Sequence, residues 1–223
     1  TVDRQCGSSQ QAVHFAAQAI MSGTADMIVA GGVQNMSKIP IASAMTAGHQ
    51  YGFDTPFVGS TGWEHRYGKQ EISQFRGAEL IADKWDVSRQ DMEMFALTSH
   101  TRARAAIATG RFDREIIAVD GHTVDEGPRS TTLEKMQALP TLVDGGRLTA
   151  ALASQISDGA SATLLASEAA VREYGLRPRA RIHHLSARGS DPVFMLSAPI
   201  PATKYALERA GLTIDDIDAV EIN

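Results

Sequence analysis

Residues 4–36, RQCGSSQQAVHFAAQAIMSGTADMIVAGGVQNM, contain the alternation of elements that decides the fold class. After Gly7, apolar side chains recur at the spacing of one helix face, at Ala12, Phe15, Ala16, Ala19 and Ile20. The continuous apolar run at 27–30, closed by two glycines, is typical of a strand buried on both faces. A turn, a helix and a buried strand in succession predict an α/β unit.

The only cysteine of the chain, Cys6, stands just before this predicted helix. The N–H groups and positive dipole end of a helix start favour the thiolate, which is the form that attacks carbonyl carbons. Position alone leaves two interpretations open: a nucleophile for covalent catalysis, or a small buried apolar side chain. One cysteine cannot form an internal disulfide, so the fold does not depend on oxidation, and we expect a cytoplasmic location.

The composition is that of an ordinary soluble globular protein. The 223 residues are 43% hydrophobic and 21% charged, with a formal net charge of −5. The sequence has no basic stripe that would indicate a nucleic-acid partner, and no apolar run near the roughly 18 residues that cross a bilayer. No spacing of His, Cys, Asp and Glu indicates a metal site. We therefore expect neither nucleic-acid binding, nor membrane insertion, nor a bound metal.

The remaining chain alternates between α/β and helical patterns. Helices are predicted at 73–85, 88–110, 168–175 and 200–211, with Ser88 as N-cap and Gly110 as C-cap of the longest one. Strands are predicted at 114–120, 158–167, 179–187 and 216–222, and residues 37–70 are interpreted as irregular. The opening and closing thirds are thus expected to be α/β, with a mostly helical insertion between them.

Most titratable side chains outside this pattern have structural interpretations. Asp91 with Glu93 and Asp215 with Asp216 are interpreted as helix-start or solvated charges. All seven histidines are interpreted as structural, with His65 the one candidate for a substrate loop.

Six stretches, in the family's order and covering nearly the whole chain, resemble the thiolase family of acetyl-CoA acyltransferases. They are RQCGSSQQAV, GTADMIVAGGVQNMS, GAELIADKWDVSRQDMEMFALTSHTRA, DEGPRSTTLEKM, SQISDGASATLLAS and PIPATKYALERAGLTIDDIDAVEIN. Ketoacyl synthases share the cysteine turn and the glycine pair but are not expected to contain DEGPR…LEKM or SQISDGA. The resemblance implies a layered α/β/α fold with a mostly helical loop domain.

The resemblance also implies a division of the chain. Residues 1–36 correspond to the N-terminal half with the nucleophile, and 37–155 to the loop domain that binds CoA and substrate. Residues 156–177 return to the first half, and 178–223 begin the C-terminal half. The chain lacks the family's Gly-His-Pro and Cys-Gly-Gly-Gly motifs and stops one residue into Asn-Glu-Ala-Phe. We therefore expect a thiolase fold that is incomplete at both ends.

A thiolase cleaves a 3-ketoacyl-CoA with free CoA, or condenses acyl-CoAs in reverse, through an acyl-cysteine intermediate. Here the resemblance places that intermediate on Cys6, a water-holding oxyanion-hole role on Asn223, and a pantetheine contact on Ser154. CoA is then a co-substrate, no cofactor is permanently bound, and the protein is a homodimer or a dimer of dimers.

The substrate class is narrowed by two local features. Some acetoacetyl-specific thiolases have a histidine six residues before the Glu of their Ala-Glu pair, where this chain has Ser73, so larger substrates of degradation are favoured over acetoacetyl-CoA alone. The stretch GWEHRYGKQEISQFRGAE is similar to actinobacterial thiolases of steroid side chains and other bulky acyl groups. Degradation of fatty acids or steroid side chains is the expected role.

Two alternatives to catalysis by this chain stay open. The chain could be a non-catalytic thiolase-like protein that binds acyl groups or lipids, or an inactive fragment. Because the family's catalytic histidine and second cysteine are not among these residues, the 223 residues alone are expected to be inactive.

Overall fold

A computed structural model describes residues 1–57 and 59–222, which fold as two compact units. The first unit contains Thr1–Ala47, Ile156–Gly189 and the segment from Pro199 onwards. The second contains Gly48–Gln155 and Ser190–Ala198. Each unit is built from segments far apart in the sequence.

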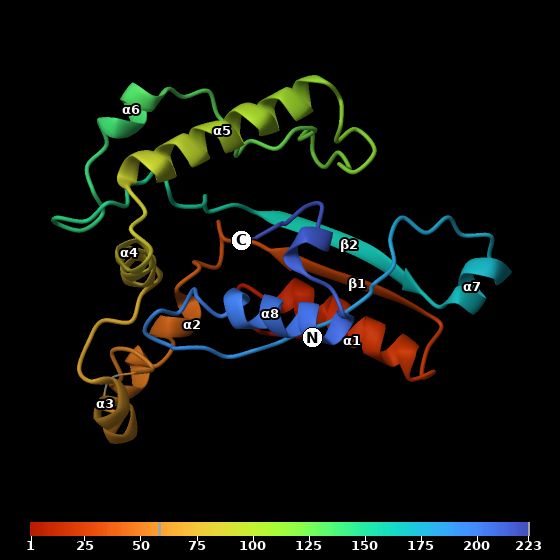
Figure 1. The fold of residues 1–223 in the computed structure, drawn as a ribbon, viewed down its shortest axis with the longest axis horizontal. Helices are drawn as coiled ribbons and strands as arrows, with labels where there is room; N and C mark the ends of the chain where they lie inside the picture. The colour runs from red at the N-terminus through yellow and green to blue at the C-terminus, as the bar shows by residue number, and fades with distance from the viewer. Residues whose placement is uncertain (58, 223) are drawn as a thin grey trace. The chain divides into compact units, whose positions relative to one another are not determined.

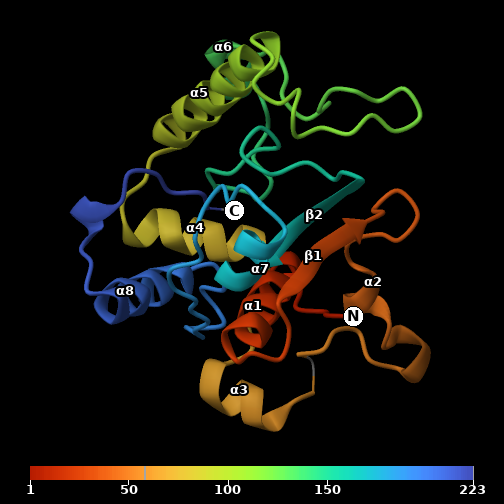
Figure 2. The ribbon, with the colours of Figure 1, turned by 90° about the vertical axis from the view of Figure 1, so that its right-hand side faces the viewer.

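The first unit is built on one helix packed against a pair of strands. Strands β1 (Met27–Gln34) and β2 (Gly159–Ala166) are antiparallel and pair along their whole length, from Met27 with Ala166 to Gln34 with Gly159. Helix α1 (Ser8–Met21) lies along one face of this pair (Figures 1 and 2). The buried core between them consists of Ala16, Ala17, Ala30 and Leu165. Small alanine side chains let the helix approach the strands closely.

The opposite face of the strand pair is exposed, which corrects the prediction of a strand buried on both faces. Side chains alternate along a strand, so Ile28 and Ala30 face α1 while their neighbours point away. Val29 is 67% exposed, Val33 79%, and Leu164 on β2 53%. Within the described residues, α1 covers one face of the pair only.

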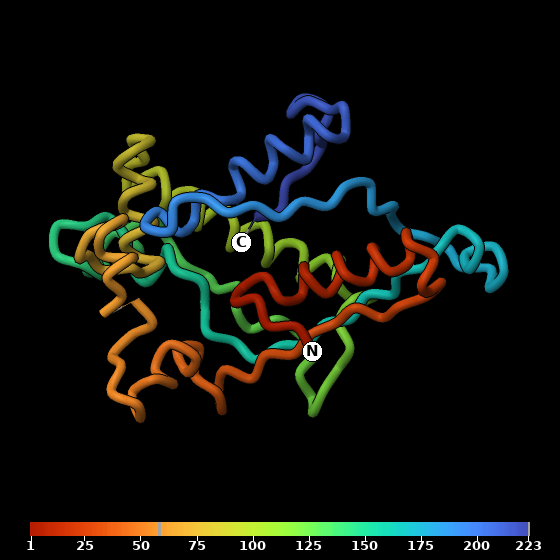
Figure 3. Tube along the Cα trace, turned by 90° about the horizontal axis from the view of Figure 1, so that it is seen from below, coloured from red at the N-terminus to blue at the C-terminus, as the bar shows by residue number. Residues whose placement is uncertain are grey.

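The rest of the first unit is helical or extended. It contains α2 (Ser43–Thr46), α7 (Glu168–Glu173), α8 (Pro199–Ala210) and the 3₁₀ turn η2 (Ile214–Asp216). Figure 3 shows the extended segment 178–189 running between α1 and α8. From this segment Ile182 and Leu185 pack against the core, and the Arg188 guanidinium carbon lies 3.4 Å from the centroid of the Tyr205 ring.

The second unit is mostly helical. Its elements are η1 (His49–Tyr51), α3 (Thr61–Tyr67), α4 (Gln74–Lys84), α5 (Arg89–Ala108) and α6 (Leu133–Gln137), with α5 the long helix in Figure 1. The helices predicted at 73–85 and 88–110 are confirmed. The interval 37–70, predicted to be irregular, contains the short helices α2, η1 and α3.

Side-chain caps explain where the two main helices of the second unit begin. The Ser73 hydroxyl accepts from the Arg76 N–H at the start of α4. Ser88 and Asp91 form a reciprocal capping box at the start of α5, which confirms Ser88 as N-cap and Asp91 as a helix-start charge. At the other end Thr109 is the C-cap, and Gly110 follows it with a φ of 68°.

Glu93 is buried, with 1% of its surface exposed, so its interpretation as a solvated charge is wrong. Its Oε1 lies 2.7 Å from Arg89 Nε, one turn earlier on α5. The Nη2 of Arg89 donates to three carbonyl oxygens around the end of α6, those of Met136, Gln137 and Leu139. One guanidinium thus neutralises a buried carboxylate and satisfies the end of a neighbouring helix.

Three predicted strands, at 114–120, 179–187 and 216–222, are wrong in the described part of the chain. Residues 179–187 are extended without ladder pairing, and the 114–120 region forms one isolated bridge, between Val119 and His122. A local β-pattern becomes a strand only where a second segment satisfies its N–H and C=O groups. Only β1 and β2 find such partners among the described residues.

Candidate active site

Cys6 lies on a tight turn immediately before α1. The Gly7 N–H donates to the Arg4 carbonyl oxygen at 2.7 Å and closes the turn, and Gly7 is the N-cap of the helix. Cys6 has a φ of 63°, which is uncommon for a residue with a Cβ, and its side chain is exposed. Backbone strain of this kind persists where the surroundings enforce it, and it occurs often at functional sites. The predicted placement of the thiol at a helix start is confirmed.

Contacts on both sides of the turn hold it in place. The Ser8 hydroxyl accepts from the Arg4 N–H at 2.9 Å, so the chain entering the turn is bound to the first residue of α1. On the strand side, a methyl group added at Gly32 would lie 2.9 Å from Ser9 Oγ. The first turn of α1 therefore rests directly on the backbone of β1, and the glycine permits this approach.

A second contact joins the end of β1 to the start of β2. The Asp158 carboxylate accepts from the Ser37 N–H at 2.9 Å and from the Ser37 hydroxyl at 2.7 Å. These two hydrogen bonds hold the pKa of the Asp158 carboxyl below its usual range, and the bond from the Ser37 hydroxyl has the larger effect. Sequence reasoning missed this pair, although both residues stand in the quoted motifs VQNMS and SQISDGA.

Ser154 belongs to the second unit and is exposed. It follows a turn anchored on the fully buried Thr149, whose carbonyl oxygen accepts from the Leu152 N–H at 2.9 Å. The adjacent Gln155 side chain donates to the Gly127 carbonyl oxygen at 3.1 Å. The first two residues of SQISDGA, 154–155, and the segment DEGPR, distant in sequence, are therefore neighbours in this unit.

The other predicted site residues have simpler surroundings. Asn223 lies outside the described residues, and its role stays a prediction. His65 is exposed on α3. His14 is buried on α1, and burial, assisted by the positive charge of Arg4, lowers the pKa of its imidazole.

Residues 1–57 and 59–222 contain no group of three or more His, Cys, Asp or Glu side chains arranged to hold a metal ion. None of their helices combines the length and apolar character needed to span a bilayer.

Comparison with family models shows which protein family has this combination of a strained cysteine turn, a helix after it and an adjacent strand. The model of the thiolase N-terminal domain matches residues 1–169, and the model of the thiolase C-terminal domain matches 176–223. The chain belongs to the thiolase family. The predicted resemblance and the predicted α/β fold class are both confirmed.

Curated relatives narrow the comparison. The chain is 70% identical to "Steroid 3-ketoacyl-CoA thiolase FadA6" of Mycobacterium tuberculosis, over all of this chain and 56% of that relative. It is 40% identical to "3-ketoacyl-CoA thiolase" of Psychrobacter cryohalolentis, over all of this chain and 57% of that protein. The chain thus spans a little more than half the length of the curated relatives it matches.

Solved structures agree with this assignment. Human mitochondrial 3-ketoacyl-CoA thiolase in complex with CoA superposes with a TM-score of 0.81 at 31% identity, over 98% of this chain and 57% of that one. Acetyl-CoA acetyltransferase from Syntrophomonas wolfei gives 0.77 at 32% identity, over 97% and 57%. The chain has a partial α/β thiolase fold.

Proposed function

We propose that the protein containing this chain is a 3-ketoacyl-CoA thiolase that uses Cys6 as its nucleophile. The observation that supports this most directly is the exposed thiol on a strained turn at the start of α1. A residue retained in an unfavourable conformation, with its side chain accessible, fits a reacting group better than a packing group. The identity to a relative named a steroid 3-ketoacyl-CoA thiolase supports bulky 3-ketoacyl-CoA substrates.

The chemistry proceeds in two transfers. The Cys6 thiolate attacks the C3 carbonyl carbon of the 3-ketoacyl-CoA, and the C2–C3 bond then breaks. The electron pair of that bond leaves on acetyl-CoA as an enolate, which takes up a proton at C2. The thiol of a second CoA then attacks the acyl-cysteine thioester, releasing the shortened acyl-CoA and the cysteine. Covalent catalysis divides one difficult cleavage into two easier steps.

The first turn of α1 supports the thiolate in this scheme. The N–H groups at the start of a helix and the positive end of its dipole stabilise a nearby negative charge. We also propose that the Cys6 N–H donates to one developing oxyanion and that Asn223 holds the water of another. Preorganised donors of this kind contribute several kcal/mol to acyl transfer.

We propose that CoA is the co-substrate and that Ser154 contacts its pantetheine arm. A related solved structure contains CoA. Ser154 is exposed and stands in a motif segment held on the buried Thr149, which suits a fixed hydrogen-bond donor for an extended ligand. The proposed layout is that of the sequence prediction: a nucleophile half at 1–36 and 156–177, a loop domain at 37–155, and a second half from 178.

We further propose a homodimer, or a dimer of dimers, located in the cytoplasm. The exposed apolar side chains of Val29, Val33 and Leu164 form a surface of the kind that a partner surface covers. An exposed thiol that must stay reduced suits the reducing cytoplasm. Light scattering of the full-length protein at micromolar concentration tests the dimer, and a monomer would contradict it.

Alkylation of the full-length protein tests the nucleophile. Iodoacetamide near neutral pH should modify Cys6, identified by peptide mass spectrometry, and should abolish thiolysis of a 3-ketoacyl-CoA. Acetyl-CoA should protect the thiol by acylating it. Cys6→Ser should lower kcat by about 10³-fold or more. Unchanged turnover in Cys6→Ser would overturn the assignment and favour a protein that only binds acyl groups.

A further inference from the structure

Arg4 is attached to the Cys6 turn and to α1 at three points. Its carbonyl oxygen accepts from the Gly7 N–H at 2.7 Å, and its own N–H donates to the Ser8 hydroxyl at 2.9 Å. Its guanidinium Nη1 donates to Gln11 Oε1 at 2.5 Å, one turn farther along the helix. One residue therefore joins the chain before the thiol to the first two turns of α1.

The start of α1 has few other contacts that could fix its position. In this helix, all of which the structure describes, the N-cap is Gly7, and no side chain caps the free N–H groups. The Gln11 N–H donates to the Gly7 carbonyl oxygen at 2.9 Å and so closes the first turn of the helix. Gln11 is thus bound to the cap by its backbone and to Arg4 by its side chain.

The guanidinium of Arg4 lies beside the helix and not only beside the turn. His14, which follows Gln11 by three residues, has its pKa lowered by burial and, as a smaller cause, by the positive charge of Arg4. Residues three apart on a helix share a face, so this charge effect and the bond to Gln11 place the guanidinium on the same side of α1.

The side-chain bond can help to maintain the strained turn. Cys6 has a φ of 63°, a conformation that persists only where its surroundings enforce it. The backbone bonds of Arg4 remain when its side chain is replaced, whereas the bond to Gln11 is lost. A hydrogen bond from a charged donor is stronger than one between neutral groups, so its loss would favour relaxation of the turn.

We propose that Arg4 is a positioning residue for the Cys6 thiol, which it holds at the start of α1 through its bond to Gln11. The inference rests on the proposed function, because the position of the thiol affects thiolysis only if Cys6 is the nucleophile. Arg4 acts through Cys6: the bond keeps the thiol where the free N–H groups of the helix stabilise its anion and where it meets the substrate carbonyl in a fixed geometry.

Steady-state kinetics of the full-length protein test this role. Arg4→Met and Gln11→Ala should each lower kcat for thiolysis of a 3-ketoacyl-CoA about tenfold and change KM less than about twofold, because a misplaced nucleophile affects the reaction more than binding. The double variant should be no slower than Arg4→Met alone, since both changes remove the same bond. Arg4→Lys keeps a donor and the charge and should recover most of the rate.

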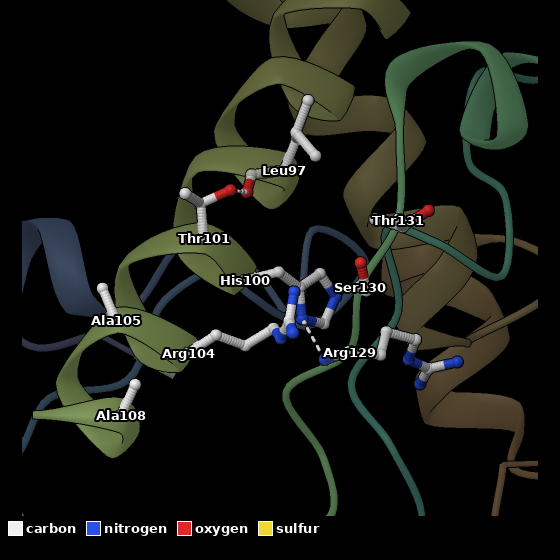
Figure 4. Close-up of a pocket in the computed structure, with 9 residues that line it drawn as sticks. All are labelled: Leu97, His100, Thr101, Arg104, Ala105, Ala108, Arg129, Ser130 and Thr131. Carbon is white, nitrogen blue, oxygen red and sulfur yellow. Dashed lines mark hydrogen bonds between the residues drawn. The ribbon is translucent and has the colours of Figure 1, made fainter. Parts of the chain in front are cut away.

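Arg102→Met is the control for net charge. Arg102 is an exposed residue of α5, and it is not among the residues that line the pocket of the second unit shown in Figure 4. Its replacement removes one positive charge, as Arg4→Met does, and should leave kcat unchanged. Equal losses of kcat in Arg102→Met and Arg4→Met would contradict the proposal.

The pH dependence of iodoacetamide labelling separates positioning from stability and from charge. Gln11→Ala keeps the guanidinium, yet it should raise the pH at which Cys6 is labelled at half the maximal rate, because the displaced thiolate loses the helix start. A lower unfolding midpoint with unchanged labelling and kcat would overturn the proposal. A change in Arg4→Met that Gln11→Ala does not share would also overturn it, and would assign the effect to charge alone.

Labelling does not require turnover, so the two proposals can fail separately. Unchanged thiolysis in Cys6→Ser would refute the nucleophile, while the shift in labelling caused by Gln11→Ala would still show that the bond from Arg4 places the thiol. Loss of activity in Cys6→Ser together with unaltered kcat and labelling in Gln11→Ala would keep the nucleophile and refute the role of Arg4.

Discussion

Ser9 of α1 and Gly32 of β1 approach so closely that a Cβ at Gly32 would lie 2.9 Å from Ser9 Oγ, while Ser9 Cβ would be 4.0 Å away. The contact places the first turn of α1, and hence the Cys6 turn, on the strand. At Gly31 the corresponding Cβ would meet a backbone atom instead, the Ser161 carbonyl oxygen, at 2.7 Å. The two glycines of the pair therefore have different neighbours and different consequences when replaced.

Gly32→Ala should move the α1 turn, because the added methyl group and the Ser9 hydroxyl cannot both keep their places. We expect a loss of about 1–3 kcal/mol in the free energy of unfolding and slower alkylation of Cys6. The double variant Gly32→Ala/Ser9→Ala removes the clashing oxygen and should recover most of the lost stability and most of the lost alkylation rate. Thermal unfolding and the rate of iodoacetamide labelling of the full-length protein measure these effects.

Gly31→Ala is the matched comparison for that rescue. Its methyl group would meet a carbonyl oxygen of β2, which no side-chain change removes, so adding Ser9→Ala should leave its destabilisation unchanged. Recovery of Gly31→Ala by Ser9→Ala, or failure to recover Gly32→Ala, would show that the helix turn is positioned by other contacts.

Ser37→Ala should weaken the junction between β1 and β2 and change its pH dependence. The Asp158 pKa is lower in the folded state than in the unfolded state, so its carboxylate stabilises the fold above the unfolded pKa near 3.8. That contribution is lost as the pH falls through the lower folded pKa. Ser37→Ala removes the hydroxyl donor, so part of the stability that the Asp158 carboxylate contributes should already be missing at pH 6. Urea unfolding between pH 3 and 6 measures the difference.

Thr213→Ala is a suitable control for that experiment. Thr213 donates to Asp216 from its N–H and its hydroxyl, which lower the pKa of that carboxyl, but the two residues are only three apart. The Ser37–Asp158 contact spans 121 residues. We expect Thr213→Ala to affect η2 locally and to lower the unfolding midpoint less than Ser37→Ala. The reverse order would contradict a role for Asp158 in joining the strands.

His14→Gln should flatten the pH dependence of stability below about pH 6.5. Burial lowers the pKa of His14 in the folded state, so the unfolded chain takes up a proton first as the pH falls. Stability is therefore highest above the unfolded pKa of about 6.5 and declines as the pH falls toward the lowered folded pKa. Thermal unfolding from pH 7.5 to 5 measures the slope, and an equally steep slope in His14→Gln would contradict this role of the buried imidazole.

Arg89→Met should destabilise the second unit by about 3–5 kcal/mol, because it leaves the buried Glu93 carboxylate without its partner. It also removes the donor to three carbonyl oxygens around the end of α6. Arg102→Met, on the exposed part of the same helix, should change stability by no more than about 0.5 kcal/mol. Denaturant unfolding compares the two, and equal effects would show that the Arg89 contacts are not stabilising.

Much of the local structure could be predicted because its causes lie within a few residues. Ser88 and Asp91 specify the start of α5 through a capping box, and the apolar period after Gly7 specifies α1. The thiol at the start of α1 followed from the same local pattern. The motif order of the chain also identified the thiolase family correctly.

Other features of the structure depend on contacts between segments that are distant in sequence. Residues 114–120 and 179–187 have the pattern of strands but no ladder partner in the described chain, so their β-propensity does not produce strands. Glu93 is buried because Arg89 can reach both its carboxylate and the end of α6. The strained Cys6 turn is positioned partly through the meeting of Ser9 with Gly32. Caps and periodicity act within one or two helical turns, whereas strand pairing, charge burial and close backbone approach require a second surface that only the folded chain supplies.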